Sequence, residues 1–255
     1  MAFVHGAMVR KGVTGMRTFN AVIETRDGAH PRAFDVVRMY NLGSATRNPD
    51  VARPHQEEVA AAGVRIALHI PTPRIYPIDP CMLTSSERIG AHGARSSGEV
   101  EIVLIKSDQL YIGVGSDHTD RDLERASIAW SKAACPNVLA PQLWAWSDIA
   151  DHWDQCRIRS QVDGRPYQDV GVDAFISPPE LLRILEERVA LPQGDFVVFC
   201  GTIVALAKEL GFGDRWSFEM EDPVLGRTIR HSYAITQLML EVREPWRVPI
   251  VTGSL

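Results

Sequence analysis

The sequence lacks three features that would each point to a particular class of protein: a basic surface, a membrane-length apolar run and a cysteine framework. It has 27 Lys and Arg against 32 Asp and Glu among 255 residues, a formal net charge of −5. Nucleic-acid partners are therefore not expected. The longest apolar run, near 196–207, is too short to span a bilayer and contains Gly201, so no membrane partner is expected either. Residues 1–15 lack the apolar core of a secretory signal.

The four cysteines are too scattered to form a recognisable metal or disulfide pattern. Cys81, Cys135, Cys156 and Cys200 include no CxxC pair, and no histidine stands at zinc-finger spacing. This usage is typical of reduced thiols. It predicts a cytoplasmic protein.

Apolar–polar alternation between turn residues predicts many short strands. Asp27-Gly28 and Asp163-Gly164 are typical of tight hairpin turns. Prolines over 71–80 indicate an irregular stretch. The expected strands are a pair within 16–43, then 99–106, 109–114, a pair within 155–172, 195–200, 215–221 and 228–235.

Helices are predicted at only three places. Residues 53–64 and 121–134 have helical patterns, and a third helix begins at Ser177, with Glu180 completing a capping box. Because no strand–helix–strand unit repeats, a Rossmann-type sheet is excluded. The chain is predicted to have a β-rich α+β fold with a few short helices.

The stretch GEVEIVLIK, residues 98–106, predicts a strand with two carboxylates on a face that otherwise looks buried. Glu99 and Glu101 share this face with Val103 and Ile105. Side chains two apart on a strand lie roughly 6.5–7 Å from each other, and burying each ionised carboxylate costs several kcal/mol. Three arrangements would relieve this: a solvated face, one protonated glutamate, or a divalent cation bound to both.

The next predicted strand ends in a third acid, Asp117. Three carboxylates form a hard-oxygen site suited to Mg²⁺, Mn²⁺ or Ca²⁺ rather than to zinc. Three protein ligands leave positions open for water or substrate, which a catalytic metal requires. Residues 98–106 alone favour the solvated face, but Val103 and Ile105 weaken that interpretation and Asp117 weakens it further, so the metal alternative stays open beside it.

These segments also show a family resemblance. The ExE pair followed by SDHTDRDLE resembles the fumarylacetoacetate hydrolase superfamily, in which ExE precedes a segment like NDxTxRDxQ. The match continues in the same order over about residues 40–235. SKAACPNVLAPQLW resembles the family segment KxxDxFxPxGPW, and VDGRPYQDV resembles its hairpin VNGExxQ. ISPPELLRIL resembles the start of a helix in the family, and LPQGDFVVFCGT resembles its segment LxPGDxIxTGT. The pattern is most similar to a branch of uncharacterised bacterial proteins defined only as a domain of unknown function.

The resemblance implies a β-roll of mixed sheets, a homodimer, and activity on a small oxo-acid or diketone. It divides the chain into a flexible N-terminal extension at 1–15, a small strand and lid region at 16–60, and a catalytic core at 61–255. Residues 53–63 are expected to form a helical lid that changes conformation when a ligand binds.

The resemblance also implies residue roles. Glu99, Glu101 and Asp117 match the ligands of a divalent ion, Mg²⁺ or Mn²⁺, with Ca²⁺ as a further candidate. Lys132 matches the active-site lysine, and Arg121 matches the arginine of the RD step, where it would bind substrate.

Two more segments carry implied roles. Thr202 matches the threonine of the TGT loop and is expected to contact substrate. His55 and Glu58, within RPHQEEV, resemble the HxxE pair that activates a water, although Glu57 competes with Glu58 for this role.

Three positions depart from the family pattern: Ser116 replaces the asparagine of NDxT, Ile203 replaces the proline after GT, and Glu124 replaces the glutamine after RD. The added charge of Glu124, at a substrate-binding position, predicts a different substrate acid group. His118 could be a fourth ligand or could orient Asp117, but strand alternation turns it away from Asp117, which favours a structural role.

Three functions remain open on this sequence. The first is a metal-dependent hydrolase that cleaves a carbon–carbon bond in a 1,3-dicarbonyl or oxo-acid substrate. The second is a hydratase, decarboxylase or tautomerase of 2-oxo or 2-hydroxy-dienoate acids on the same metal site. The third is a non-catalytic protein of this fold that binds a metal or a ligand.

Overall fold

The structure of the chain is a computed structural model that describes residues 15–48, 69–202, 206 and 209–248. The predicted helix at 53–64, the lid, His55 and Glu58 lie outside these residues. Within the described ranges, no helix combines the length and the apolar composition that crossing a membrane requires.

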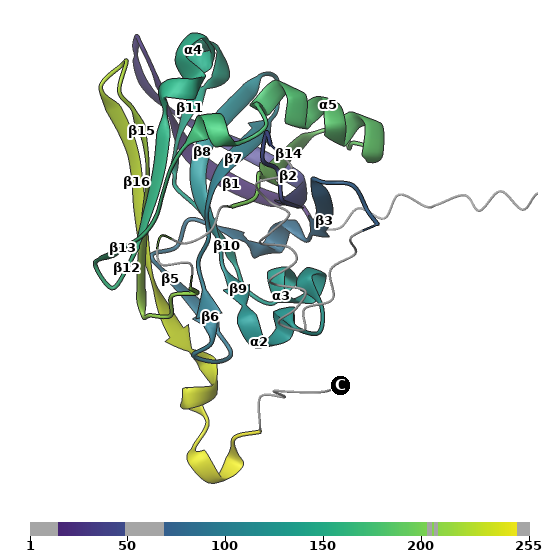
Figure 1. The fold of residues 1–255 in the computed structure, drawn as a ribbon, viewed down its shortest axis with the longest axis vertical. Coiled ribbons are helices and arrows are strands. Elements are labelled where there is room, and N and C mark those ends of the chain that lie inside the picture. Colours follow the sequence, from purple (N-terminus) through teal and green to yellow (C-terminus); the bar gives the residue numbers. More distant parts are fainter. Residues whose placement is uncertain (1–14, 49–68, 203–205, 207–208, 249–255) are drawn as a thin grey trace, which may run out of the picture.

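Strands dominate the fold, and nine of them form one sheet that closes on itself (Figure 1). The strand order is β11-β1-β2-β14-β7-β8-β10-β4, with β3 added on β2, and β11 also pairs with β8. That additional pairing closes the sheet into a roll. The strands are β1 (Arg17–Thr25), β2 (Gly28–Gly43), β3 (Arg74–Ile78), β4 (Leu83–Thr84), β7 (Val100–Lys106), β8 (Leu110–Asp117), β10 (Asn137–Leu139), β11 (Gln142–Ala145) and β14 (Asp195–Phe199).

A second sheet of five strands, in the order β13-β12-β15-β16-β5, stands beside the roll, on the left in Figure 1. Its strands are β5 (Arg88–Ala91), β12 (Arg157–Val162), β13 (Arg165–Gly171), β15 (Arg215–Asp222) and β16 (Arg227–Gln237). A separate pair joins β6 (Ser96–Ser97) to β9 (Thr119–Asp120).

The helices are short and lie outside the sheets. The α-helices are α2 (Arg121–Glu124), α3 (Ile128–Ala133), α4 (Trp146–Ile149) and α5 (Pro178–Arg188). The 3₁₀ helices are η1 (Pro80–Met82), η2 (Ala150–Gln155), η3 (Val172–Ala174), η4 (Leu238–Glu241) and η5 (Glu244–Trp246). The predicted β-rich α+β fold with a few short helices is therefore confirmed.

Strand β7 separates two hydrophobic cores because its side chains alternate. Val103 and Ile105 belong to the core enclosed by β1, β2, β8 and β14 of the roll. Ile102 and Leu104 belong to the core shared with β12, β15 and β16 of the second sheet. The alternation predicted from the sequence is confirmed, and both faces of β7 are buried.

The hairpins follow from local turn chemistry. Asp163 and Gly164 have φ values of 48° and 76°, the left-handed values that a two-residue type I′ turn requires. In the first hairpin Thr25 pairs with Gly28, so the two turn residues lie one position earlier than predicted.

The helix predicted at 121–134 is instead two helices, because the segment contains two N-caps. The Asp120 carboxylate accepts a hydrogen bond from the backbone N–H of Asp122 at the start of α2. The Ser127 hydroxyl accepts one from Trp130 N–H at the start of α3. A residue that caps a new helix has extended backbone angles, so the chain breaks there.

Two other predictions are wrong. Part of the stretch expected to be irregular forms β3, which lies on the edge of the sheet against β2; an edge strand tolerates Pro77 because one side of it needs no ladder bonds. Ser177 begins α5, but its side chain makes no capping bond, and Glu180 pairs with Arg183 instead.

The N-terminal strands are integral to the roll. β1 pairs with β11 and β2 pairs with β14, so the segment predicted as a small N-terminal region contributes two strands to the closed sheet. The boundary expected at residue 60 falls outside the described residues and stays a prediction.

Candidate metal centre

The sheet register brings the three carboxylates together. Glu101 stands opposite Gly115 in the antiparallel pair of β7 and β8, and Asp117 N–H donates to the Glu99 carbonyl over 3.1 Å. Directly opposed residues point to the same face of a sheet, so Glu99, Glu101 and Asp117 share one face. One carboxylate oxygen from each lies within 4.8 Å of the other two.

Burial removes the solvated-face alternative for two of the three. Glu101 and Asp117 are 0 % exposed, and the side chain of Glu99 is 16 % exposed. Burial is the main cause that raises the pKa of Glu101 well above its usual value, and the charge of Asp117 raises it further. In the metal-free protein burial therefore favours the protonated form of Glu101.

Lys132 reaches the cluster from α3. Its ammonium contacts Asp117 Oδ2 and lies 3.6 Å from Glu99 Oε2. Burial acts to lower the pKa of Lys132, but the charges of Asp117 and Glu99 outweigh it, and the pKa is raised. The ammonium is therefore charged throughout the neutral range.

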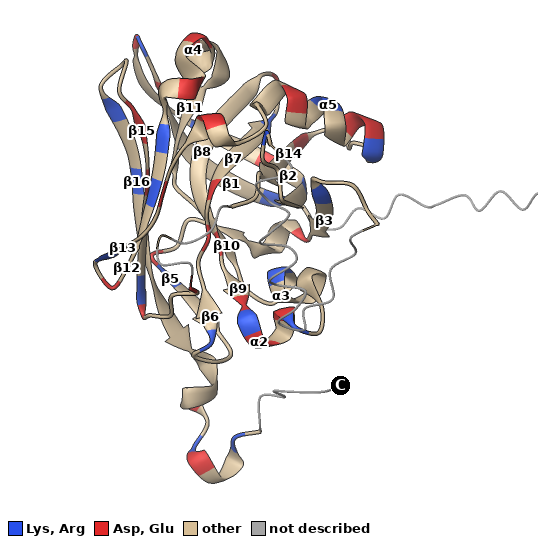
Figure 2. Cartoon of the chain, viewed as in Figure 1, with Lys and Arg blue, Asp and Glu red and all other residues tan. Residues whose placement is uncertain are grey.

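Arg121, the first residue of α2, closes the other side of the cluster. Its guanidinium donates to Glu99 Oε1 over 2.8 Å, to Glu124 Oε2 over 2.9 Å and to Ser97 Oγ over 2.6 Å. Figure 2 shows acidic and basic residues close together in sequence along β9 and α2, and a basic residue on α3.

The Glu101 carboxylate is only half satisfied. Oε2 accepts a hydrogen bond from Gly201 N–H over 2.8 Å, whereas Oε1 is buried and has no hydrogen-bond partner among the described residues. Gly201 has φ 83°, and a Cβ there would lie 2.9 Å from the Leu42 carbonyl oxygen. Only glycine can therefore present its N–H at this point.

The charges leave room for a divalent cation. Among the described residues, four carboxylates, Glu99, Glu101, Asp117 and Glu124, face two cations, Arg121 and Lys132, so within this part of the chain acids outnumber bases by two when all four are ionised. A buried carboxylate oxygen without a partner costs several kcal/mol. A divalent ion would supply the missing charge and a partner for Glu101 Oε1, so the residues fit such an ion.

Thr202 lies beside Val100, the first residue of β7. Its hydroxyl donates to the Val100 carbonyl over 2.9 Å and accepts from Gln168 Nε2 over 2.8 Å. Gln168 Oε1 also accepts from Val100 N–H over 2.8 Å. Because the Thr202 proton is already used, its hydroxyl could serve a substrate only as an acceptor.

Sequence reasoning assigned no role to Gln168, Gly201 or Asn137. Asn137 stands opposite Asp117 in the register of β10 and β8, and its Nδ2 lies 3.4 Å from Asp117 Oδ1. Its own Oδ1 is buried and finds no hydrogen-bond partner in the part of the chain that the structure describes. Gln168 could have been found from its place in the VDGRPYQDV hairpin. Asn137 could have been found as a polar residue directly before the apolar residues Val138 and Leu139.

His118 points away from the carboxylates, as strand alternation predicts. Its Nδ1 lies 2.9 Å from Tyr233 Oη and its Nε2 lies 2.9 Å from Ser96 Oγ. Burial, assisted by the charge of Arg121, lowers the pKa of His118 to about 3. The ring is neutral and fully hydrogen-bonded, which fits the structural role.

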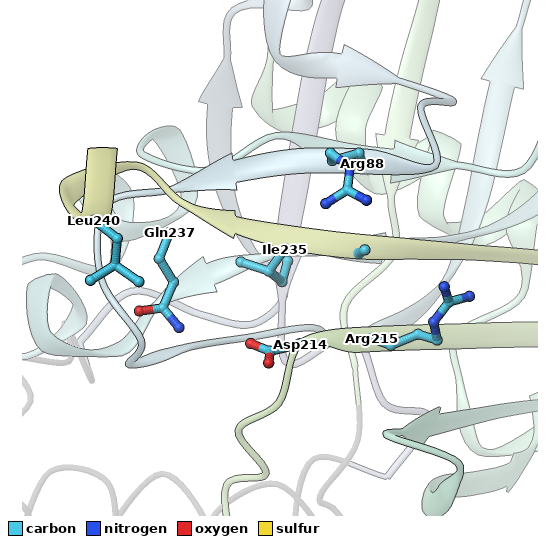
Figure 3. A pocket seen from close by; sticks show the side chains of 7 residues that line it. Arg88, Asp214, Arg215, Ile235, Gln237 and Leu240 are labelled. Atoms are coloured by element: carbon cyan, nitrogen blue, oxygen red, sulfur yellow. The ribbon is translucent and has the colours of Figure 1, made fainter. Parts of the chain in front are cut away.

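A separate pocket of about 420 Å³ opens where β5, β15 and β16 lie side by side (Figure 3). None of the three carboxylates lines it, and its lining residues are Arg88, Asp214, Arg215, Ala234, Ile235, Gln237 and Leu240. The pocket is therefore separate from the buried carboxylate cluster, which is the candidate functional site.

Solved structures define the class to which the fold belongs. The fumarylpyruvate hydrolase from Pseudomonas aeruginosa, solved in complex with Mn²⁺ and pyruvate, aligns with a TM-score of 0.57 at 18% identity over 85% of this chain and 95% of its own. The 5-carboxymethyl-2-hydroxymuconate delta-isomerase from Mycobacterium smegmatis gives 0.55 at 14% identity over 86% and 98%. A fumarylacetoacetate hydrolase family protein from yeast gives 0.54 at 13% identity over 78% and 93%. The fold is thus the fumarylacetoacetate hydrolase fold.

The sequence then defines the branch. Residues 43–233 match the family described as proteins of unknown function, DUF2848, and the chain belongs to this family. No curated protein matches the sequence significantly. The predicted fold family and the predicted branch are both confirmed.

Proposed function

We propose that this protein is a divalent-metal-dependent hydrolase that cleaves a carbon–carbon bond in a 1,3-dicarbonyl or oxo-acid substrate. The observation that carries the proposal is the buried cluster of Glu99, Glu101 and Asp117, in which Glu101 Oε1 has no hydrogen-bond partner among the described residues. The Mn²⁺ and pyruvate named for the fumarylpyruvate hydrolase of the same fold support it.

Each residue has a chemical task in this proposal. Glu99, Glu101 and Asp117 would hold Mg²⁺ or Mn²⁺, with Ca²⁺ as a further candidate. The bound ion would polarise the carbonyl oxygens of the substrate. Lys132 keeps a charged ammonium beside Asp117 and Glu99, from which it can donate a hydrogen bond to an oxyanion or a carboxylate of the substrate.

The remaining steps concern water and the leaving carbon. His55, oriented by Glu58, would take a proton from water. The water oxygen bonds to the carbonyl carbon, the carbon–carbon bond breaks, and the bonding electrons leave with the departing carbon, which is then protonated. Thr202 would accept a hydrogen bond from substrate, while Arg121 and Glu124 would set the charge at the substrate's distal end.

A second function on the same site is supported by the isomerase among the structures of this fold. A hydratase, decarboxylase or tautomerase of a dienoate acid would use the same carboxylates and Lys132. Such an enzyme would depend less on a water molecule positioned for attack. Replacing His55 should therefore reduce its turnover less than that of a hydrolase. A non-catalytic binding protein is supported only by the departures at Ser116, Glu124 and Ile203.

Metal-dependent turnover is the first test of this proposal. Incubation with acylpyruvates, β-diketones and dienoates in Mg²⁺ or Mn²⁺ is expected to release two smaller products from one acylpyruvate or diketone. A chelator should abolish turnover, and added Mn²⁺ should restore it, because the carboxylate cluster is otherwise protonated or paired with Lys132. Product analysis by mass spectrometry distinguishes cleavage from hydration or isomerisation, and turnover that survives the chelator would contradict the metal proposal.

Glu124→Gln should change which substrates are accepted. Arg121 is neutralised by Glu99 and Glu124 on two sides, so the wild-type site should disfavour a second carboxylate near Arg121. Removing one of these charges should raise kcat/KM for dicarboxylate substrates relative to monocarboxylates by about tenfold, equivalent to about 1.4 kcal/mol.

Glu187→Gln is a matched control, since Glu187 also pairs with an arginine, Arg183, but on the exposed face of α5. The ratio of the two kcat/KM values should not change in this variant. An unchanged ratio in Glu124→Gln as well would contradict a role for Glu124 in substrate selection.

We also propose a cytoplasmic homodimer that acts on a small-molecule substrate. The chain beyond β16 extends away from the body of the fold (Figure 1) and carries exposed apolar side chains at Leu240, Trp246 and Val248, which supports packing against a second copy. Sedimentation should give twice the chain mass of 28.3 kDa.

A further inference from the structure

One tyrosine hydroxyl of the second sheet contacts both neighbours of Asp117. Tyr233 Oη, on β16, lies 2.8 Å from Ser116 Oγ and 2.9 Å from His118 Nδ1. Ser116 and His118 precede and follow Asp117 on the chain, so their side chains point to the opposite face of the strand. The hydroxyl therefore holds the backbone on both sides of the carboxylate.

The second hydrogen bond of His118 extends this link. Its Nε2 lies 2.9 Å from Ser96 Oγ, and Ser96 pairs with Asp120 in the ladder of β6 and β9. Rotation of the β8 end, which would swing Asp117 away from its present direction, would break the hydrogen bonds of both ring nitrogens. Such partners fix the direction in which a ligand points.

The same hydroxyl also packs beside the other acidic strand. A Cβ added at Gly98 would lie 2.5 Å from Tyr233 Oη and 2.7 Å from Ser116 Oγ. Gly98 immediately precedes Glu99, so the chain can approach the tyrosine this closely only because that position lacks a side chain. The Tyr233 hydroxyl is thus hydrogen-bonded to the side chains of both neighbours of Asp117 and lies close to Gly98, the residue before Glu99.

The position of the tyrosine is itself fixed. Its side chain is 1 % exposed, its ring meets the His118 ring edge to face with centroids 5.6 Å apart, and its backbone pairs with Trp216 on β15. The hydroxyl is therefore held by the second sheet, which supplies none of the three carboxylates.

We propose that Tyr233 is a positioning residue of the metal centre: its hydroxyl links Ser116, His118 and Gly98, and thereby sets the spacing and direction of Glu99 and Asp117. The inference rests on the metal binding proposed above. It explains how Ser116 can serve at a position where the family pattern has asparagine, because the serine hydroxyl bonds to Tyr233.

Tyr233→Phe tests this, because it removes one oxygen and keeps the ring. Mn²⁺ affinity, measured by titration calorimetry, is expected to fall by about 10–100-fold, the usual cost of removing a group that orients metal ligands. Tyr111→Phe is the matched control: Tyr111 is also 1 % exposed, and its hydroxyl bonds to Arg32 and Gln109. Both variants should lose similar thermal stability, but only Tyr233→Phe should lose Mn²⁺ affinity.

The outcomes separate this inference from the proposed function. If the wild type binds Mn²⁺ and Tyr233→Phe binds it equally well, the positioning role is wrong and the metal site stands. If the wild type binds no Mn²⁺, both are wrong. Should Tyr233→Phe not fold, Ser116→Ala removes one of the two hydrogen bonds; it should weaken Mn²⁺ binding by about tenfold, and unchanged affinity would overturn the inference.

Discussion

Replacing Glu101 with glutamine is expected to weaken Mn²⁺ binding by on the order of a hundredfold or more, since even groups that only orient a ligand cost about 10–100-fold. The substitution keeps the shape of the side chain and can keep the bond from Gly201 N–H to the side-chain oxygen. It removes the charge that an ion would bind and replaces one possible oxygen ligand with an amide nitrogen. Turnover should be lost together with metal affinity.

The fold should survive this substitution. Burial and the charge of Asp117 raise the pKa of Glu101, so the folded state binds this proton more tightly than the unfolded chain does. Above the unfolded pKa the ionised side chain therefore destabilises the metal-free fold. A neutral glutamine lacks this penalty, and the melting temperature of metal-free Glu101→Gln should equal or exceed that of the wild type.

Glu221→Gln provides the control for Glu101→Gln, because Glu221 pairs with Arg159 on the second sheet, outside the carboxylate cluster. It should bind Mn²⁺ as the wild type does. Equal Mn²⁺ binding by wild type and Glu101→Gln in calorimetry would refute the three-carboxylate site and most of the proposed function.

Replacing Lys132 with methionine is expected to produce the second large effect. Metal-free Lys132→Met should lose about 3–5 kcal/mol of stability, the cost of leaving buried charges without their partner. The ammonium of Lys132 contacts Asp117 and is close to Glu99, so these carboxylates would lose one neighbouring positive charge. Turnover should fall by about 10²–10³, as when one donor to an oxyanion is removed.

Mn²⁺ should restore part of the stability of Lys132→Met, because the ion supplies positive charge to the same carboxylates. Thermal melting with and without Mn²⁺ measures this. Lys106→Met is the matched control, since Lys106 Nζ donates to the Ser107 carbonyl at the far end of β7; its stability should change little. A Lys132→Met protein that is as stable and as active as the wild type would contradict the assigned role.

Much of the candidate metal centre could be predicted from short stretches of sequence. Alternation over residues 99–106 fixed which side chains share a face, and the structure places Glu101 with Val103 and Ile105 on one side of β7. A strand that ends in Asp117 follows after a short turn, so the antiparallel register brings that acid beside Glu99. Period-two alternation and turn chemistry are local properties, which is why they can be read directly.

Other predictions failed because local signals were too short or were overridden. Strands β4, β6, β9, β10 and β11 have two to four residues, too few to show a period. Ser177 had a local capping partner in Glu180, but Arg183 binds that carboxylate instead. In α2 and α3, the second cap at Ser127 outweighed a continuous helical pattern.

By itself, the sequence determined which side chains share a strand face, the hairpin at Asp163-Gly164 and the three neighbouring acids. Its motifs also determined the fold family. Only the tertiary structure decided how those acids are held. Gly201 reaches Glu101 from 100 positions away and Tyr233 reaches Ser116 from 117 positions away, and both contacts depend on which strands lie side by side. Strand pairing is set by the packing of two cores over the whole chain, and no local period or turn signal encodes it.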